Sequence, residues 1–163
     1  MQIRYMNATF GVLAQAELTL QPGLNVIYAP NESGKSTWSR FIRSMLYGVN
    51  TREKTPLADK NRYAPWSGAA MGGRMDVSVG DDVYTIRRRT RRANAPMGDF
   101  SCTYDGTATS VPGITAQNAG EQLLGITPEV FARSAFISQA ALPVDQDAEL
   151  ERRSAALITT GEV

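Results

Sequence analysis

The strongest chemical pattern in the chain is a stretch that could hold the phosphate groups of a nucleotide, Ala29-Pro30-Asn31-Glu32-Ser33-Gly34-Lys35-Ser36-Thr37. It fits the pattern G-x-x-x-x-G-K-[ST], except that Ala29 stands where the first glycine is usual. In such a loop, successive backbone N–H groups cradle phosphate oxygens, and Gly34 permits the unusual backbone path that this requires. The Lys35 ammonium would reach the β and γ oxygens, and the Ser36 hydroxyl would bind Mg²⁺. Glu32 is less expected beside anionic phosphates, and we interpret it as an outward-pointing, solvated side chain.

Two elements must position this loop, a strand before it and a helix after it. Residues 24–28 form a short apolar run that is typical of a strand buried on both faces. From residue 35 to residue 47, apolar side chains recur at spacings of three and four, and Gly48 then favours a helix end. The order of strand, loop and helix is the context that a phosphate-binding loop needs.

The rest of the chain predicts mainly short strands around this unit. Alternation and β-branched residues predict strands over 2–10 and 13–20, and an antiparallel meander over 73–109. We expect helices over 117–124 and 128–134, a short buried strand over 135–138 and an amphipathic helix over 147–160. A length of 163 residues suggests one domain covering residues 1–163.

Composition excludes several kinds of site. The chain has no histidine, which excludes a Ser-His-Asp site and a His-ligated metal. Its single cysteine, Cys102, excludes an internal disulfide and a cysteine-cluster zinc site. No apolar run is long enough to cross a membrane and no signal peptide is evident, so we expect a cytoplasmic protein that does not bind membranes. The net charge of +1 means that any attraction to nucleic acid must be local.

The segment Asn25-Val26-Ile27-Tyr28-Ala29-Pro30-Asn31-Glu32-Ser33-Gly34-Lys35-Ser36-Thr37 resembles the ATPase heads of the SMC/SbcC/RecF-like branch of the ABC ATPases. Within that branch, the loop sequence Asn31-Glu32-Ser33-Gly34-Lys35-Ser36-Thr37 is most similar to that of bacterial YhaN-like AAA proteins. The stretches over 41–48, 62–66 and 157–161 also resemble that group. The resemblance covers nearly the whole chain, most specifically residues 24–48 and 131–142.

The resemblance implies an α/β fold, the N-terminal lobe of an ABC-type ATPase head. We expect a mixed sheet around the phosphate-loop helix, plus an antiparallel β layer from residues 2–28 and 73–109. Phe136-Ile137-Ser138-Gln139 is similar to the Q-loop, so Gln139 would contact Mg²⁺ and the attacking water, and Lys35 and Gln139 would be catalytic. The implied ligands are ATP and Mg²⁺. The implied partners are a C-terminal ATPase lobe, a second copy of the head engaged on ATP, and DNA, in repair or chromosome maintenance.

Several features of that family are missing from the 163 residues. We find no acidic Walker B strand, no Ser-Gly-Gly signature and no histidine, so we expect the C-terminal lobe and the coiled coil to be absent. Hydrolysis needs a carboxylate near Mg²⁺ and a base for the attacking water. We therefore expect the chain alone to bind nucleotide weakly at most and to hydrolyse it negligibly. The alternative is a nucleotide-gated interaction module without catalysis, and a P-loop kinase for a small molecule fits less well.

Five arginines lie within the six residues from Arg87 to Arg92. In a strand, Arg87, Arg89 and Arg91 would share one face, and Arg88 and Arg92 the other. A half-buried sheet should bury neither set unpaired. One interpretation is a contact with the DNA backbone, and the other is a solvated edge strand that resists aggregation. Arg62, Tyr63 and Trp66 could line a base pocket or simply pack a turn, and Cys102 is expected to be a small core residue.

Overall fold

The structure of the chain is a computed structural model that describes residues 1–135 and residue 155. The chain divides into two compact units, Met1–Gly125 and Ile126–Val163. The first unit contains the phosphate-loop pattern and the arginine run.

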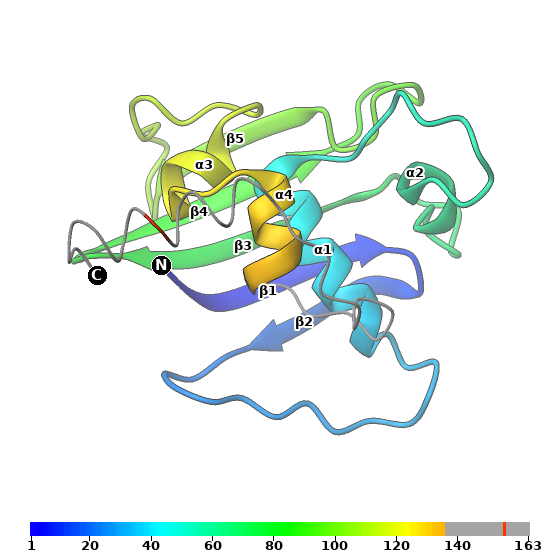
Figure 1. Ribbon diagram of the computed structural model, residues 1–163, viewed down its shortest axis with the longest axis horizontal. Coiled ribbons are helices and arrows are strands. Elements are labelled where there is room, and N and C mark those ends of the chain that lie inside the picture. Colours follow the sequence, from blue (N-terminus) through cyan, green and yellow to red (C-terminus); the bar gives the residue numbers. More distant parts are fainter. Residues whose placement is uncertain (136–154, 156–163) are drawn as a thin grey trace. The chain divides into compact units, whose positions relative to one another are not determined.

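The first unit is built on one sheet of five strands, in the order β2-β1-β3-β4-β5, and every pair of neighbours is antiparallel (Figure 1). The order places β1 beside β3, far along the sequence, so the sheet joins the N-terminal hairpin to the later meander. The strands are β1 (Gln2–Phe10), β2 (Leu13–Thr19), β3 (Gly72–Val79), β4 (Asp82–Arg89) and β5 (Asp99–Tyr104). The predicted antiparallel layer is confirmed over these residues.

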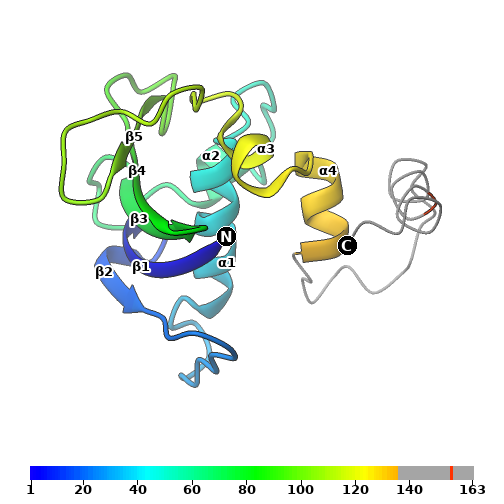
Figure 2. The same cartoon turned by 90° about the vertical axis from the view of Figure 1, so that its left-hand side faces the viewer.

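One face of the sheet forms the core because successive side chains of a strand point to opposite faces. Met6 lies beside Met75, Met75 beside Ile86 and Ile86 beside Cys102, so one buried row crosses four strands. Helix α1 (Lys35–Tyr47) covers this face with the fully buried ring of Phe41, and Figure 2 shows the helix running along one side of the sheet. The helix spans the residues that the sequence pattern predicts.

A glycine allows α1 to approach the sheet this closely. A Cβ on Gly73 of β3 would lie 2.5 Å from the Cζ atom of Phe41 and 2.4 Å from the backbone oxygen of Asn7. The ring of Phe41 meets that of Phe10 edge-on, with 5.8 Å between centroids. Because Gly73 has no side chain, the Phe41 ring packs directly on the backbone of β3. This close packing fixes the position of α1 against β1 and β3.

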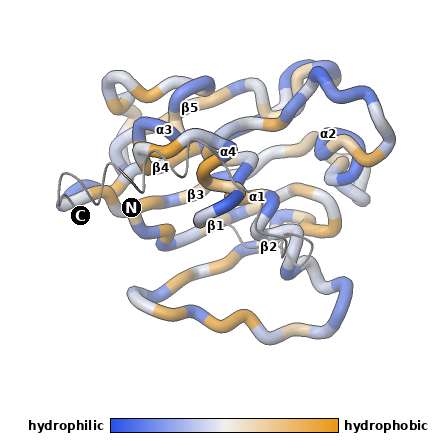
Figure 3. Tube along the Cα trace, viewed as in Figure 1, coloured by the Kyte–Doolittle hydropathy of each residue, from blue (hydrophilic) through white to orange (hydrophobic). Residues whose placement is uncertain are grey.

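The predicted strand over residues 24–28 does not form. Leu24, Val26 and Tyr28 are 92%, 83% and 99% exposed, and Figure 3 shows hydrophobic stretches along the extended segment between β2 and α1. A strand needs a neighbouring backbone, and within the described residues none pairs with this segment. The expected mixed sheet around the phosphate-loop helix is also wrong for the described part of the chain, whose strand pairs are all antiparallel.

Besides α1, residues 1–135 contain three short α-helices and one π-helix. Helix α2 (Asp59–Arg62) lies where the sequence patterns predict no helix, and α3 (Ala119–Leu124) confirms the helix expected over 117–124. In the second unit, α4 (Pro128–Val130) continues into the π-helix η1 (Phe131–Ala135), and the Thr127 hydroxyl caps α4 by accepting from Val130 N at 3.3 Å. Ala135 is therefore helical, while the rest of the strand expected over 135–138 lies outside the described residues. Ala155 alone is described within the helix expected over 147–160, and it is helical.

Candidate nucleotide-binding site

The loop before α1 is exposed and turns tightly on itself. Ser33 N donates to the backbone oxygen of Pro30 at 3.4 Å, and its hydroxyl donates to the same oxygen at 2.6 Å. Glu32 has a φ of 65°, in the left-handed region that non-glycine residues seldom adopt, and its side chain is exposed as expected. The strained turn leaves residues 31–33 exposed to solvent, whereas Gly34 is buried.

Gly34 is the residue on which the loop depends most. Its φ of 95° favours glycine, and an added Cβ would lie 2.8 Å from Leu13 Cδ2 and 3.1 Å from Val12 Cγ1. The loop is thus seated directly against the β1–β2 turn. Both the backbone conformation and the close approach explain why a glycine is needed here.

The N-terminus of α1 is left open toward the loop. The first helical bond runs from Trp38 N to the Gly34 oxygen at 3.0 Å. Within the described residues no side chain caps this end, and the first turn carries no acidic residue. Uncapped N–H groups and the positive end of the helix dipole make a site for an anion. The Lys35 ammonium donates to the backbone oxygen of Ala29, which closes the loop and keeps the cation beside it.

A second segment supports the loop from behind. Gly11, in the β1–β2 turn, would bring a Cβ to 3.2 Å from Thr37 Cγ2, and its N–H donates to the Tyr63 oxygen at 2.7 Å. The ring of Tyr63 stacks on that of Phe10, with 5.0 Å between their centroids. Tyr63 therefore packs a turn, which is the second of the two interpretations given for it above. Trp66 donates its backbone N–H to Gly11 O at 3.0 Å while its side chain stays 76% exposed.

The Ser36 hydroxyl is a suitable ligand for an Mg²⁺ ion whose other ligands come mainly from a nucleotide and water. Ser36 lies exposed in the first turn of α1, next to Lys35. In the described part of the chain, no group of three His, Cys, Asp or Glu residues could hold a metal ion by itself. Mg²⁺ commonly keeps several waters and is bound through one or two protein oxygens plus phosphates, so such a cluster is not required. Gln139, the second expected ligand, lies outside the described residues.

The arginine run is divided between the two faces of β4, which ends at Arg89. Arg87 and Arg89 point to the solvent face, whereas Arg91 lies beyond the strand and pairs with Asp99 at 2.9 Å. The Arg89 guanidinium lies 3.8 Å from the same carboxylate. The expectation that the three share one strand face is therefore wrong for Arg91.

Arg88 is buried, but it is not unpaired, as the expectation required. The residue is 2% exposed, and its guanidinium donates to Met45 O at 2.8 Å and to Ala116 O at 2.9 Å. It also lies 4.7 Å from the ring centroid of Phe100. Burial lowers the pKa of Arg88 to about 10. Carbonyl groups at the C-terminal end of α1, rather than a carboxylate, compensate the charge, and no sequence pattern points to them.

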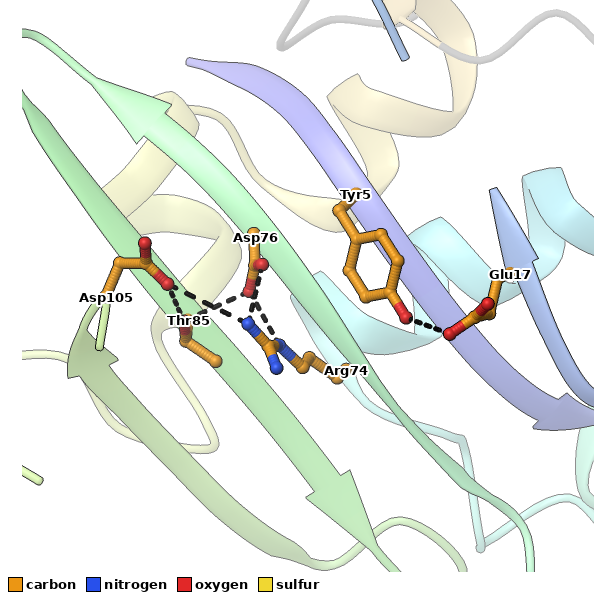
Figure 4. Close-up of polar contacts among 6 residues, drawn as sticks. All are labelled: Tyr5, Glu17, Arg74, Asp76, Thr85 and Asp105. Atoms are coloured by element: carbon orange, nitrogen blue, oxygen red, sulfur yellow. Dashed lines mark hydrogen bonds and ion pairs between the residues drawn. The ribbon is translucent and has the colours of Figure 1, made fainter. Parts of the chain in front are cut away.

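The solvent face of the sheet carries a polar cluster, shown in Figure 4, which sequence reasoning missed. Arg74 bonds both oxygens of Asp76, at 2.9 and 2.8 Å, and Thr85 donates to Asp76 at 3.0 Å. The hydrogen bond to Asp76 raises the pKa of Arg74. Nearby, Tyr5 donates to Glu17 at 2.6 Å, which raises the pKa of Tyr5. Alternation along β3 already places Arg74 beside Asp76 on one face, whereas the register of β3 and β4 is what brings Thr85 to Asp76.

The described residues include no helix long and apolar enough to cross a membrane. Residues 1–133 match the family model described as an AAA domain. Over 133 residues the chain is 28% identical to a protein of Halobacterium salinarum named DNA double-strand break repair Rad50 ATPase. That alignment covers 81% of this chain and 15% of the relative, so the chain spans a small part of the relative's length. Because the family match covers most of the sequence, the chain belongs to the AAA domain family.

Proposed function

We propose that this chain supplies the ATP- and Mg²⁺-binding part of an SMC-like ATPase. One observation carries the proposal: Gly34 holds an exposed loop in a left-handed turn against an uncapped helix N-terminus, with Lys35 beside it. Such an arrangement favours an anionic group. The family match and the named ATPase activity of the relative support a nucleotide as that anion.

Within this proposal, residues 31–37 bind the nucleotide phosphates. The Lys35 ammonium leaves the Ala29 oxygen and contacts the terminal phosphates, where its charge stabilises the bound nucleotide. Ser36 and Gln139 hold Mg²⁺, which neutralises developing charge on the phosphates when it is bound. Lys35 and Gln139 are the residues that we propose as catalytic.

The exposed segment over 24–28 supports a further lobe. Leu24, Val26 and Tyr28 are more than 80% exposed there, and leaving this much apolar surface in water is unfavourable. We propose that a strand from a C-terminal ATPase lobe pairs with it and that two heads engage each other on ATP. Hydrolysis then depends on the added lobe, and the described chain alone hydrolyses ATP negligibly.

The biological setting follows from the relative. Its name assigns that protein to DNA double-strand break repair. We propose that the ATP-driven engagement of this head likewise serves DNA repair or chromosome maintenance in the cytoplasm, in a protein of YhaN-like type.

A calorimetric titration with ATP·Mg²⁺ tests the nucleotide site. Lys35→Ala should weaken binding about 10- to 100-fold, corresponding to a loss of about 1.5–3 kcal/mol from one charge-assisted contact. Lys54→Ala is the matched control, since Lys54 is an exposed lysine outside the loop, and should leave the affinity unchanged. Equal affinities for wild type and Lys35→Ala would contradict the proposal.

The exposed 24–28 segment also favours a second candidate, a nucleotide-gated interaction module without catalysis. Adding the separate C-terminal lobe distinguishes the two. DNA-stimulated ATP turnover in the mixture supports the ATPase. ATP-dependent binding of the lobe without turnover supports the interaction module.

A further inference from the structure

The indole of Trp66 is left in water although the backbone that carries it is fixed. The side chain is 76% exposed. The backbone N–H of Trp66 donates to Gly11 O at 3.0 Å, and Gly68 N donates to Pro65 O at 3.0 Å, which closes a turn around the residue. A single exposed apolar side chain is common on protein surfaces, so the role of this one depends on what lies beside it.

The turn between β1 and β2 connects Trp66 to the phosphate loop. Gly11 of that turn accepts the backbone N–H of Trp66. The next residue, Val12, reaches the loop, because a Cβ added to Gly34 would lie 3.1 Å from Val12 Cγ1. Gly11 itself lies against the first turn of α1, where an added Cβ would come within 3.2 Å of Thr37 Cγ2. The backbone of Trp66 therefore lies beside the residues that we propose to bind the phosphates.

A second aromatic residue of the same segment, Tyr63, fixes the segment in place. Tyr63 is 8% exposed, and its ring stacks on that of Phe10 with 5.0 Å between the centroids. The Tyr63 oxygen accepts the N–H of Gly11 at 2.7 Å, so Gly11 holds the segment at two points. Tyr63 thus serves packing, whereas Trp66, on the same anchored segment, presents its indole to solvent.

The neighbouring loop determines the kind of ligand that this indole would meet. A phosphate loop holds only the charged end of a nucleotide, and the ribose carries the base away from the loop to its surroundings. Planar bases stack on aromatic side chains, and every base has a π-face for such a contact. A stacking contact therefore adds affinity for the nucleoside part of the ligand and discriminates weakly between bases.

We propose that the Trp66 indole stacks on the base of the nucleotide whose phosphates residues 31–37 bind. This contact rests on the proposed nucleotide function and deepens it, because it assigns a residue to the nucleoside part of the ligand. ATP and GTP should bind with similar affinity, since both purines can stack on the indole. The phosphate chain without a nucleoside should bind more weakly than ATP.

Calorimetric titration of the full chain with two ligands tests the contact. One ligand is ATP·Mg²⁺, and the other is inorganic tripolyphosphate with Mg²⁺, which offers the phosphate chain without a nucleoside. Trp66→Ala should weaken ATP binding about 5- to 100-fold and change tripolyphosphate binding less than about twofold. Trp66→Phe keeps an aromatic ring and should restore most of the ATP affinity. Leu57→Ala is the matched control, because Leu57 is also 76% exposed, and it should change neither affinity.

Tryptophan fluorescence gives a second readout, because the chain has two tryptophans in different environments. Trp38 is 8% exposed and packs edge-on against Phe41, whereas Trp66 is open to solvent. ATP should quench the emission of the wild-type chain by stacking on Trp66. The quench should be absent in Trp66→Phe, which retains only Trp38, and tripolyphosphate should quench neither protein.

Two results would overturn the stacking contact and leave the nucleotide site intact. The first is equal ATP affinity in wild type and Trp66→Ala. The second is an equal loss for ATP and tripolyphosphate in Trp66→Ala, which would mean that the substitution disturbs the loop. A wild-type chain that binds neither ligand would overturn both the contact and the proposed function. Urea midpoints of Trp66→Ala and Leu57→Ala like that of wild type show that any loss of affinity is not due to unfolding.

Discussion

Arg87 and Arg88 are neighbours in β4, but Arg87 lies on the solvent face of the sheet and Arg88 on the core face. Arg87 lines an open groove on the solvent face, with no carboxylate partner in the described residues. Arg88 is buried on the core face, where backbone oxygens of Met45 and Ala116 accept its hydrogen bonds. The two side chains have the same charge and the same length, and only their direction from the strand differs.

This difference shows what makes a buried cation tolerable. The last carbonyl groups of a helix have no partner within the helix and carry the negative end of its dipole. Arg88 donates hydrogen bonds to backbone oxygens of two segments, the C-terminal end of α1 and the segment at Ala116. Its guanidinium also stacks on the ring of Phe100. Among the described residues Arg87 makes no such contacts, and its guanidinium lies on the solvent face of the sheet.

We expect the largest effect on stability from a substitution of the buried arginine, Arg88. Arg88→Met fills a similar volume but leaves the carbonyls of Met45 and Ala116 without a donor, so we expect a loss of about 2–3 kcal/mol in the free energy of unfolding. Arg87→Met, the matched control, should change it by less than about 0.5 kcal/mol. Urea unfolding measures both.

A stability loss of equal size in Arg87→Met and Arg88→Met would contradict the comparison. Arg88→Lys sharpens it further. A lysine keeps the charge but lacks the planar fork that reaches two carbonyls, so its stability should fall between those of wild type and Arg88→Met.

A smaller effect is expected on the solvent face, at the pair of Asp76 and Arg74. Asp76→Asn removes a charge-assisted pair in which the Arg74 side chain is 40% exposed, so solvent screening limits the loss to about 1 kcal/mol in urea unfolding. An unchanged urea midpoint in Asp76→Asn would contradict a stabilising role of this pair.

The smallest effect concerns Cys102, which lies on the core face opposite Ile86. Burial raises the pKa of its thiol from 9.0 to about 11. Between these values the unfolded chain loses the proton while the folded chain keeps it, so stability falls as the pH rises through this range and is unaffected well below 9.0. Urea midpoints across this range should therefore decline more in wild type than in Cys102→Ala. Parallel declines would show that the thiol is not protected.

Sequence patterns predicted the elements that depend on local order. The spacing of Trp38, Phe41 and Met45 gave the bounds of α1, and alternation located β1. The loop at Gly34 was identified because its residue types must lie next to one another. The strand over 24–28 could not be excluded in this way, since an apolar run shows that a segment suits burial and not whether a neighbouring strand is present.

What the sequence by itself determined is the order of strand-forming and helix-forming segments, the phosphate-loop pattern and the concentration of arginines in residues 87–92. Only the tertiary structure decided which charged side chains are buried and which groups they contact. The register of β3 and β4 put Thr85 beside Asp76, and the docking of α1 brought the backbone oxygens of Met45 and Leu46 to Arg88. These partners lie far apart in the chain or on different elements. Their contacts depend on packing between elements, which local residue preferences do not encode.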